Sequence, residues 1–490
     1  MAHLRASPRG HTEAGVFELR ESSGPLYLRI ADAVATAIRG GRVRAGERLP
    51  STRDLAKQLG VHRKTVGAAY TELMSQGLVA TAHGRTTMVA RALPPSIAPT
   101  PGGGVPSTSG FELAATSPPY TGTRRAAGLL TLLGGIPDLR FAWPAELGRA
   151  YSRALRRRDG HRLLDYGDPR GDDRLRTALA DLLRRTRGLS ATPDNVIVMR
   201  GALQGLYVAA RALLRPGDRV AIEALAHPAA VGILRVCGAQ LEPIPVDAHG
   251  LDVGALVRLC RRQRIRAVYL TPCHQLPTTV TLAPARRREL LALAQDHGMV
   301  VLEDDYDHEF HYDGPPALPL AAADRAGVVV YFGTFSKVLA PGLRLGYVVA
   351  PPDVVTQLAR YRTFVDQHGD RVQERAIAEL LEDGDLERFV RRARRTYQAR
   401  RDALCEELGA QLPRLELAVP RGGMAVWLRA PGVATEPWAQ RALAAGVAFQ
   451  PGSTFAVAGN AREHARVGFA SCTPRELAEA VRRMARTMIV

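Results

Sequence analysis

The amino-acid sequence predicts an α/β protein in two folded parts, a small winged helix-turn-helix module and a large domain with a mainly parallel sheet. Three observations support this prediction. Helical and hairpin patterns fill residues 25–91, proline and glycine are frequent in residues 92–128, and strands alternate with helices in residues 129–490. A chain of 490 residues also exceeds one ordinary domain and has ample length for a sizeable core.

The composition argues against several classes of protein. Lys and Arg outnumber Asp and Glu by 66 to 48, and this net charge of +18 favours polyanionic partners. The five cysteines are scattered and lack paired spacing, so neither a disulfide framework nor a metal site is predicted. No apolar segment approaches the length of a membrane span, and the polar N-terminus lacks a signal-peptide core. We therefore expect a soluble cytoplasmic protein.

Three helices and a hairpin are predicted in residues 25–91. Residues 1–24 show no periodicity and are expected to form a flexible tail. Apolar residues then recur at helical spacing, and Ser51 is placed to cap the second helix. The helices are expected from Pro25 to Gly40, from Ser51 to Gly60 and from His62 to Gln76, and the strands at residues 78–81 and 86–89. This order of elements is that of a winged helix-turn-helix.

Basic residues concentrate in this module. Residues 25–91 hold 11 Arg or Lys against 4 Asp or Glu, an excess of +7. A recognition helix presents its N-terminal end to base edges, and the tip of a wing reaches phosphate or the minor groove. A module used only for protein contacts is the alternative. The residues expected to contact double-stranded DNA are Arg53, Arg63, Lys64, Thr65 and Arg85.

Residues 92–128 are expected to form a linker. Between Ala92 and Arg125 there are 7 Pro and 5 Gly among 34 residues, and such a composition cannot fold alone. A long linker lets the helix-turn-helix module sit away from its own large domain, so the module can pack on a partner subunit.

The large domain is predicted from short apolar strands that alternate with amphipathic helices. In such sheets the carboxyl ends of the strands line the ligand crevice. Strands are expected at residues 196–199, 219–222, 267–270, 299–302 and 328–332, and helices at residues 172–187, 203–214 and 283–297.

A lysine, Lys337, follows the strand at residues 328–332. Burial at a strand end lowers the pKa of a lysine, and the neutral amine can form a Schiff base with a carbonyl compound. The hydroxyls of Thr334 and Ser336 and the cation of Arg344 can hold a phosphate. An aldehyde and a phosphate together suggest pyridoxal phosphate. A surface lysine after a core strand is the alternative.

Three other stretches carry chemistry that matches this cofactor. The segment 201–203, between a strand and a helix, can present backbone N–H groups to an anion, or it is an ordinary turn. Asp304 can keep a pyridine ring protonated while Tyr306 bonds a phenolic oxygen, although acidic residues at a strand end also fit magnesium. Arg466, in an apolar run, needs either a substrate carboxylate or an internal Asp or Glu.

These motifs and their order resemble known families. Residues 25–91, through Leu49-Pro50-Ser51-Thr52-Arg53-Asp54-Leu55-Ala56 and Gly60-Val61-His62-Arg63-Lys64-Thr65-Val66, resemble the GntR-family winged helix. Residues 129–490 resemble the class I aminotransferases of fold type I, so the whole chain is similar to MocR-type transcriptional regulators. The resemblance implies pyridoxal 5'-phosphate, a homodimer, operator DNA and a smaller C-terminal α+β subdomain at about residues 365–490.

The resemblance also implies a role for each site residue. Lys337 would form the internal aldimine, Asp304 would pair with the pyridine nitrogen and Tyr306 would bond the ring oxygen. Arg466 would receive the carboxylate of the effector, and Tyr166 would reach the phosphate of the neighbouring subunit. The residues implied for the phosphate are Gly201, Ala202, Leu203, Thr334, Ser336 and Arg344.

Three positions depart from the aminotransferase pattern. His227 stands where an aromatic ring is expected beside the cofactor. Leu276-Pro277-Thr278-Thr279 replaces a loop ending in Asn-Pro-Thr-Gly or Phe-Pro-Thr-Gly, which removes an asparagine contact and a turn glycine. Asp304 is one residue nearer to the tyrosine than in most aminotransferases, a spacing usual in the regulators.

These three departures argue against efficient transamination more than against cofactor binding. They fall where substrate and ring are positioned, and a transaminase needs no winged helix. We therefore expect a pyridoxal-phosphate-dependent DNA-binding transcriptional regulator that senses an amino acid or related amine. The alternatives are a catalytically active aminotransferase with an attached DNA-binding head, and a cofactor-free DNA-binding dimer.

Overall fold

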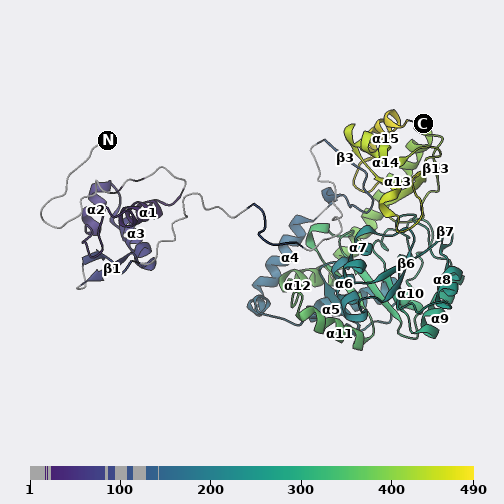
Figure 1. Cartoon of the computed structure of the whole chain (residues 1–490), viewed down its shortest axis with the longest axis horizontal. Coiled ribbons are helices and arrows are strands. Elements are labelled where there is room, and N and C mark those ends of the chain that lie inside the picture. The colour runs from purple at the N-terminus through teal and green to yellow at the C-terminus, as the bar shows by residue number, and fades with distance from the viewer. Residues whose placement is uncertain are drawn as a thin grey trace. The chain divides into compact units, whose positions relative to one another are not determined.

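A computed structural model describes two compact units, residues 1–115 and 116–490, and each is considered by itself (Figure 1). The described residues are 17, 19, 24–82, 86–93, 107–113, 128–141 and 143–489. Most of the expected tail and linker, and Arg85, lie outside these ranges. Within them, no helix combines the length and the apolar character that a membrane span requires.

The first unit is a winged helix-turn-helix, as the sequence predicts (Figure 1). Helices α1, α2 and α3 pack on one another, and the two strands of the hairpin pair antiparallel from Val79 with Val89 to Ala82 with Thr86. The elements are α1 (Leu26–Arg39), α2 (Thr52–Leu59), α3 (Arg63–Ser75), β1 (Val79–Ala82) and β2 (Thr86–Val89). Their core is built from residues such as Val34, Ile38, Leu55, Val66 and Leu73.

Local sequence explains the turn between α2 and α3. Ser51 caps α2, because its Oγ accepts a hydrogen bond of 3.2 Å from the Asp54 N–H and donates one of 2.6 Å to the Asp54 carboxylate. Gly60 ends the helix with a left-handed φ of 65°. The buried Tyr70 hydroxyl on α3 donates to the Pro50 carbonyl over 2.8 Å. This bond fixes α3 against the start of α2.

The second unit contains a seven-stranded sheet in the order β4-β12-β11-β10-β9-β5-β6. Neighbouring strands pair in parallel except at β12, which runs antiparallel to both β4 and β11. The mainly parallel sheet is therefore confirmed. The strands are β4 (Val196–Met199), β5 (Arg219–Glu223), β6 (Gln240–Ile244), β9 (Ala267–Leu270), β10 (Val300–Asp304), β11 (Val329–Thr334) and β12 (Gly346–Val349).

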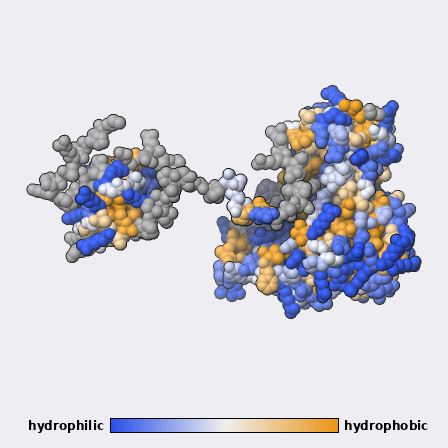
Figure 2. All heavy atoms as spheres, in the orientation of Figure 1, coloured by the Kyte–Doolittle hydropathy of each residue, from blue (hydrophilic) through white to orange (hydrophobic). Residues whose placement is uncertain are grey.

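Helices cover both faces of this sheet. Alternate residues of β11 enter different cores, Val329 and Tyr331 on one face and Val330 and Phe332 on the other. Helices α5, α8 and α9 contribute to the first core and α6, α7 and α11 to the second. Polar residues cover much of the visible outer surface of this unit (Figure 2). The helices are α5 (Asp173–Arg187), α6 (Ala202–Leu213), α7 (Pro228–Val236), α8 (Val253–Cys260), α9 (Pro284–His297), α10 (Leu320–Ala323) and α11 (Pro352–Thr363).

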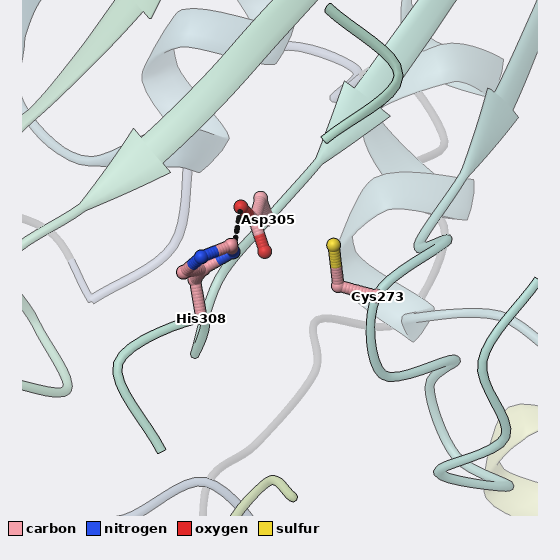
Figure 3. Close-up of side chains that lie close together, drawn as sticks. All are labelled: Cys273, Asp305 and His308. Atoms are coloured by element: carbon pink, nitrogen blue, oxygen red, sulfur yellow. Dashed lines mark ion pairs between the residues drawn. The ribbon is translucent and has the colours of Figure 1, made fainter. Parts of the chain in front are cut away.

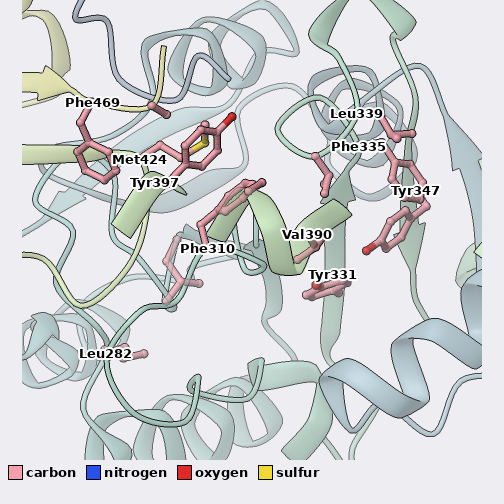
Figure 4. Packing of buried hydrophobic residues seen from close by; sticks show 14 of the residues in the cluster. Leu282, Phe310, Tyr331, Phe335, Leu339, Tyr347, Val390, Tyr397, Met424 and Phe469 are labelled. Atoms are coloured by element: carbon pink, nitrogen blue, oxygen red, sulfur yellow. The ribbon is translucent and has the colours of Figure 1, made fainter. Parts of the chain in front are cut away.

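A four-stranded antiparallel sheet, in the order β13-β14-β17-β16, forms the C-terminal part. Helix α13 packs on α15 and also joins the main core, where Tyr397 lies 5.1 Å from Phe310 between ring centroids (Figure 4). The elements are α13 (Asp385–Gln411), β13 (Glu416–Leu417), β14 (Ala425–Arg429), α14 (Thr435–Ala444), β16 (Gln450–Pro451), β17 (His464–Gly468) and α15 (Pro474–Thr487).

Two contacts cross the expected boundary near residue 365. Helix α12 (Arg371–Glu382) packs on α4 (Pro144–Arg156) and α5, at the side of the large sheet. Strand β3 (Leu130–Thr131) pairs in parallel with β15 (Val447–Ala448) of the C-terminal part. Strand β3, near the start of this unit, therefore lies beside the C-terminal part. A short antiparallel ribbon, β7 (Val246–Asp247) with β8 (Gly250–Leu251), completes the elements.

Candidate functional site

The carboxyl ends of β9, β10 and β11 and the N-terminus of α6 surround a cavity of about 160 Å³. This is the strand edge at which the sequence predicts a ligand crevice. Ten of the predicted site residues line the cavity: Ala202, Leu203, His227, Asp304, Tyr306, Thr334, Ser336, Lys337, Arg344 and Arg466. The structure thus brings together residues that lie as much as 264 positions apart, from 202 to 466.

Lys337 lies in the turn after β11. The buried side chains of Phe335 and Leu339 anchor this turn in the core, and the Phe335 N–H donates to the Leu345 carbonyl over 3.0 Å (Figure 4). Burial and the nearby Arg466 cation lower the pKa of Lys337 from its ordinary 10.5 to about 8. A Cβ on Gly135 would stand 3.3 Å from Nζ, so the glycine leaves room around the amine.

The lowered pKa predicts how cofactor attachment depends on pH. Only the neutral amine attacks an aldehyde, and its fraction rises about tenfold per pH unit below the pKa. If Lys337 is the amine to which the implied cofactor attaches, the rate of attachment in cofactor-free protein should therefore rise up to about pH 8 and then level off. Stopped-flow absorbance after addition of pyridoxal phosphate would measure it. A rate that keeps rising toward pH 10 would contradict a lowered pKa.

Asp304 ends β10 with its carboxylate at the cavity. The Tyr269 hydroxyl donates to Asp304 Oδ2 over 2.7 Å, while Oδ1 is buried without a hydrogen-bond partner among the described residues. Burial raises the pKa of Asp304 to about 6. The buried Tyr306 hydroxyl meets no geometric criterion for a hydrogen bond within the described part of the chain, although burial and the nearby Asp307 carboxylate raise its pKa. Such unsatisfied groups are costly unless a ligand completes them, and a protonated ring nitrogen and a ring oxygen would do so.

The start of α6 forms an anion-binding corner. Gly201, with φ 87°, precedes the helix, which has no side-chain cap on its first N–H groups. The Arg344 guanidinium donates to the Arg200 carbonyl over 3.2 Å and would stand 3.0 Å from a Cβ on Gly201. The Ser336 N–H donates to Thr334 Oγ1 over 3.1 Å, which holds both hydroxyls in this corner. These donors match the doubly charged phosphate of the implied cofactor.

Arg466 projects from β17 into the cavity and is 2% exposed. Its Nε and Nη2 have no hydrogen-bond partner, and no Asp or Glu of the described chain forms an ion pair with it. Gly134 permits this position, because a Cβ there would lie 1.8 Å from Nη1. A buried guanidinium with open donors fits the carboxylate of a ligand.

Three predicted residues differ from the rest in their placement. His227 lines the cavity as the N-cap of α7, its Nδ1 accepts a hydrogen bond of 3.1 Å from the Ala229 N–H, and burial beside Lys337 lowers its pKa to about 4. Gly201 does not line the cavity and lies against the Arg344 guanidinium, which does. Tyr166 does not line the cavity of its own chain and is 78% exposed. Its role toward a neighbouring subunit stays a prediction.

The sequence missed several cavity residues. Gly134 and Gly135 line the cavity and precede any recognisable motif, while Tyr269, which does not line the cavity but bonds to Asp304, lies in an apolar strand and resembles a core residue. Gln450 accepts a hydrogen bond of 3.1 Å from the Gly134 N–H and comes from the C-terminal part. A glycine pair is the one signal that points to a close approach. The other lining residues to which the sequence assigns no role include Pro341 and Phe455.

Thr279, where the resemblance leads us to expect glycine, has a left-handed φ of 64°. This conformation costs a β-branched residue roughly 1–2 kcal/mol and costs glycine almost nothing. We expect Thr279→Gly to raise the free energy of unfolding by about 1 kcal/mol, after the greater chain entropy of glycine is subtracted. Urea denaturation would measure the change, with Thr279→Ser as the control that keeps a Cβ. A glycine variant less stable than the serine variant would contradict backbone strain.

The predicted DNA contacts lie on two helices of the first unit. Arg63 and Lys64 open α3 and are exposed, Thr65 is half-buried, and Arg53 is exposed in the first turn of α2. Arg63 Nε donates to Thr52 Oγ1 over 3.3 Å, which ties the start of α3 to α2. The N-terminal end of α3 is therefore both basic and accessible, as a recognition helix requires.

Comparison with known proteins identifies the class. Residues 138–484 match the family described as aminotransferase class I and II, and residues 26–89 match the bacterial regulatory proteins of the gntR family. The HTH-type transcriptional regulator TauR of Rhodobacter capsulatus is 34% identical over 484 residues, which cover 95% of this chain and 97% of TauR. The probable rhizopine catabolism regulatory protein MocR of Rhizobium meliloti is 31% identical over 79% of this chain and 78% of its own.

Solved structures agree for the large domain. The α-aminoadipate aminotransferase LysN of Thermus thermophilus, complexed with N-(5'-phosphopyridoxyl)-L-leucine, matches with a TM-score of 0.69 and 30% identity over 74% of this chain and 92% of LysN. Fold and matches together define a transcriptional regulator with an aminotransferase-like domain. The chain belongs to the class I and II aminotransferase family, in the MocR-type branch that carries a GntR helix-turn-helix.

Proposed function

We propose that this regulator holds pyridoxal 5'-phosphate in the cavity and uses it to sense an amino acid or related amine. One observation carries the proposal. A lysine with a lowered pKa shares the cavity with a buried carboxylate oxygen and a buried guanidinium that both lack partners among the described residues. The lysine would bond to the aldehyde of the cofactor, the carboxylate oxygen of Asp304 would meet its ring nitrogen, and the guanidinium of Arg466 would bind the carboxylate of the amino acid.

The residues present fit the cofactor. The N-terminus of α6 with Thr334, Ser336 and Arg344 would hold the phosphate, and Tyr306 would donate to the ring oxygen. Asp304, already oriented by Tyr269, would hold a proton on the ring nitrogen. When bound, pyridoxal phosphate supplies an aldehyde that bonds reversibly to amines. Lys337 would be the resident amine, and once an effector amine replaces it, its Nζ can hold the proton released at the exchange.

The effector is proposed to be an amino compound with a carboxylate. Arg466 provides two open donors at the cavity, on the side where Gly134 makes room. A guanidinium binds a carboxylate with two parallel hydrogen bonds, which fixes both its charge and its orientation. Amines without a carboxylate should therefore bind more weakly.

The output is proposed to be a change in DNA binding. Arg53, Arg63, Lys64 and Thr65, together with Arg85, would contact the operator. A homodimer would bring two such heads to one operator and would place Tyr166 at the partner's phosphate site. We propose a cytoplasmic location, where the DNA lies. For the effector to act as a switch, it must bind two arrangements of the dimer with different affinity.

A working aminotransferase is the second candidate, because aminotransferases such as the 2-aminoadipate transaminase of Thermus thermophilus are 33% identical over 74% of this chain. Two observations count against efficient turnover. His227 replaces an aromatic ring, and Leu276 lines the cavity where the family pattern has asparagine or phenylalanine, so the asparagine contact is lost. Release of keto acid from a panel of amino acids, at many turnovers per minute, would favour the enzyme.

The test is a titration of operator DNA. A duplex selected by the protein from a random pool would be titrated with and without pyridoxal phosphate and with a panel of amino acids and simple amines. We expect at least one amino acid to shift the midpoint about 5- to 150-fold, the usual range of coupling between two sites. Binding that is indifferent to every compound would contradict the switch.

Variants of the winged helix-turn-helix module would show whether the proposed residues contact the selected duplex. Arg63→Ala and Lys64→Ala should each weaken binding by about 1–3 kcal/mol if they contact bases, and Lys64→Ala should lower the salt dependence if it contacts phosphate. Arg184→Ala, an exposed arginine on α5, is the matched control and should leave the DNA affinity unchanged.

A further inference from the structure

A thiol, a carboxylate and an imidazole meet in the core beside the cavity. Cys273 follows β9, Asp305 follows β10, and His308 lies three residues further on, with ligand atoms that all fall within 4.8 Å of one another. All three side chains are buried. Figure 3 shows the Asp305 carboxylate between the other two groups, with one oxygen toward the His308 ring and the other on the side of the Cys273 sulfur.

One atom of this cluster points to a missing ligand. Asp305 Oδ2 accepts hydrogen bonds of 2.8 Å from Tyr331 and 2.8 Å from His308 Nδ1, but Oδ1 has no partner among the described residues. The Asp305 side chain is 1% exposed, so water does not reach Oδ1 from bulk solvent. The bond to Asp305 places a proton on His308 Nδ1, while Nε2 is buried without a partner among the described residues. A buried carboxylate oxygen left unsatisfied is costly.

Charged groups of both signs surround the cluster. Arg187 approaches Asp305 to 3.9 Å, but it also forms an ion pair with Glu309. The charge of Arg187 is therefore balanced by Glu309, and Asp305 keeps its own negative charge.

Burial and the nearby Asp305 and Glu303 carboxylates raise the pKa of Cys273 well above its ordinary value. Its thiol donates to the Ala317 carbonyl over 3.6 Å. A metal would displace this proton, and the thiolate and Asp305 would then supply two negative charges to a divalent ion, beside Arg287 Nη2 at 4.0 Å from Sγ.

We propose that Cys273, Asp305 and His308 bind one zinc ion or a similar divalent transition metal. Sulfur, nitrogen and oxygen donors in one site select such metals over magnesium or calcium, which prefer oxygen alone. Bonds of about 2.0–2.3 Å require the three ligand atoms to close by roughly 1 Å from their present separation. The fourth position would hold water. This site does not depend on the proposed function.

The metal would brace the wall of the cavity. It would join the segment after β9 to the C-terminal end of β10, where Asp304 and Tyr306 flank Asp305. The sequence predicts no metal site because the ligands lie at positions 273, 305 and 308, a spacing that matches no metal motif.

The experiment uses the full-length protein without a polyhistidine tag, grown with zinc and purified with bound cofactor. Elemental analysis should give one zinc per chain. After exchange to cobalt, a thiolate-to-cobalt charge-transfer band and visible d–d bands should appear at one equivalent. Cys273→Ala and His308→Gln should each lose the metal or bind it at least about 100-fold more weakly. Cys472→Ser, a buried cysteine outside the cluster, is the control and should keep it.

Two outcomes would overturn the proposal. One is wild-type protein with no stoichiometric zinc that also gives no charge-transfer band with cobalt. The other is Cys273→Ala protein that keeps the band and the stoichiometry. If the substituted proteins unfold, the wild-type protein still decides, because zinc must raise its unfolding temperature and protect one buried thiol from a thiol reagent. Absence of both effects would also exclude the site.

Discussion

Lys337→Ala is expected to abolish covalent capture of pyridoxal phosphate and, with it, any response of operator binding to amines. The chain offers a sharp test, because it holds only three lysines, Lys57, Lys64 and Lys337. Borohydride reduction of the wild-type protein should fix the cofactor to the peptide that contains Lys337, and mass spectrometry would locate it. The variant should give no reduced adduct and no cofactor absorption band of the bound form.

The fold should survive this substitution. The amine lies near Arg466 and Arg344, which oppose its charge. It also lies near Asp307 and Asp304, which favour its charge, so its removal takes away repulsion and attraction together. The unfolding temperature of protein without cofactor should therefore change little.

Lys57→Ala on α2 is the matched control and should keep the adduct at Lys337. An adduct at Lys57 or Lys64 in the wild-type protein, or one that persists in Lys337→Ala, would refute the assignment.

Short motifs at strand ends made the centre of this site predictable. Lys337, Thr334 and Ser336 follow one buried strand, and Asp304 and Tyr306 follow the next. Because the carboxyl ends of parallel strands meet at one edge, local sequence and the direction of the strands suffice to bring these residues together. The structure places all five on the same cavity.

Residues that act through distant partners could not be predicted. Tyr269 looks like a core residue in an apolar strand, and only the neighbouring position of β9 and β10 brings its hydroxyl to Asp304. Gly134 stands under Arg466 because β3 returns to the C-terminal region. Sequence periodicity reports which side chains are buried, and it does not report which segment lies across from them.

The direction of strands was equally hidden. Gly346–Val349 is a short apolar run, and nothing in its pattern distinguishes a parallel strand from an antiparallel one. The structure places it antiparallel between β4 and β11. This position has a consequence for the site, since the turn from β11 into β12 carries both Lys337 and Arg344 and keeps them at the same sheet edge.

Arg466→Gln is expected to remove discrimination between amino acids and amines that lack a carboxylate. Loss of one partner of a buried charge pair costs about 2–5 kcal/mol of binding, which corresponds to roughly 30- to several-thousand-fold in affinity. The affinity for a plain amine should change little. Spectroscopic titration of the cofactor-loaded protein with an amino acid and with its decarboxylated amine would measure both. Equal losses for the two ligands would contradict a carboxylate contact.

The same substitution has two further effects that a merely structural arginine would not produce. Because the Arg466 cation lowers the pKa of Lys337, the plateau of the attachment rate should move from about pH 8 to higher pH in Arg466→Gln. Breaking an internal buried ion pair costs 3–5 kcal/mol of stability, whereas removing an unpaired buried cation should leave the stability of cofactor-free protein unchanged or higher. Arg462→Gln, an exposed arginine just before β17, is the control and should shift neither quantity. A strongly destabilised Arg466→Gln protein would mean that a carboxylate of the chain itself, and not a ligand, satisfies this guanidinium.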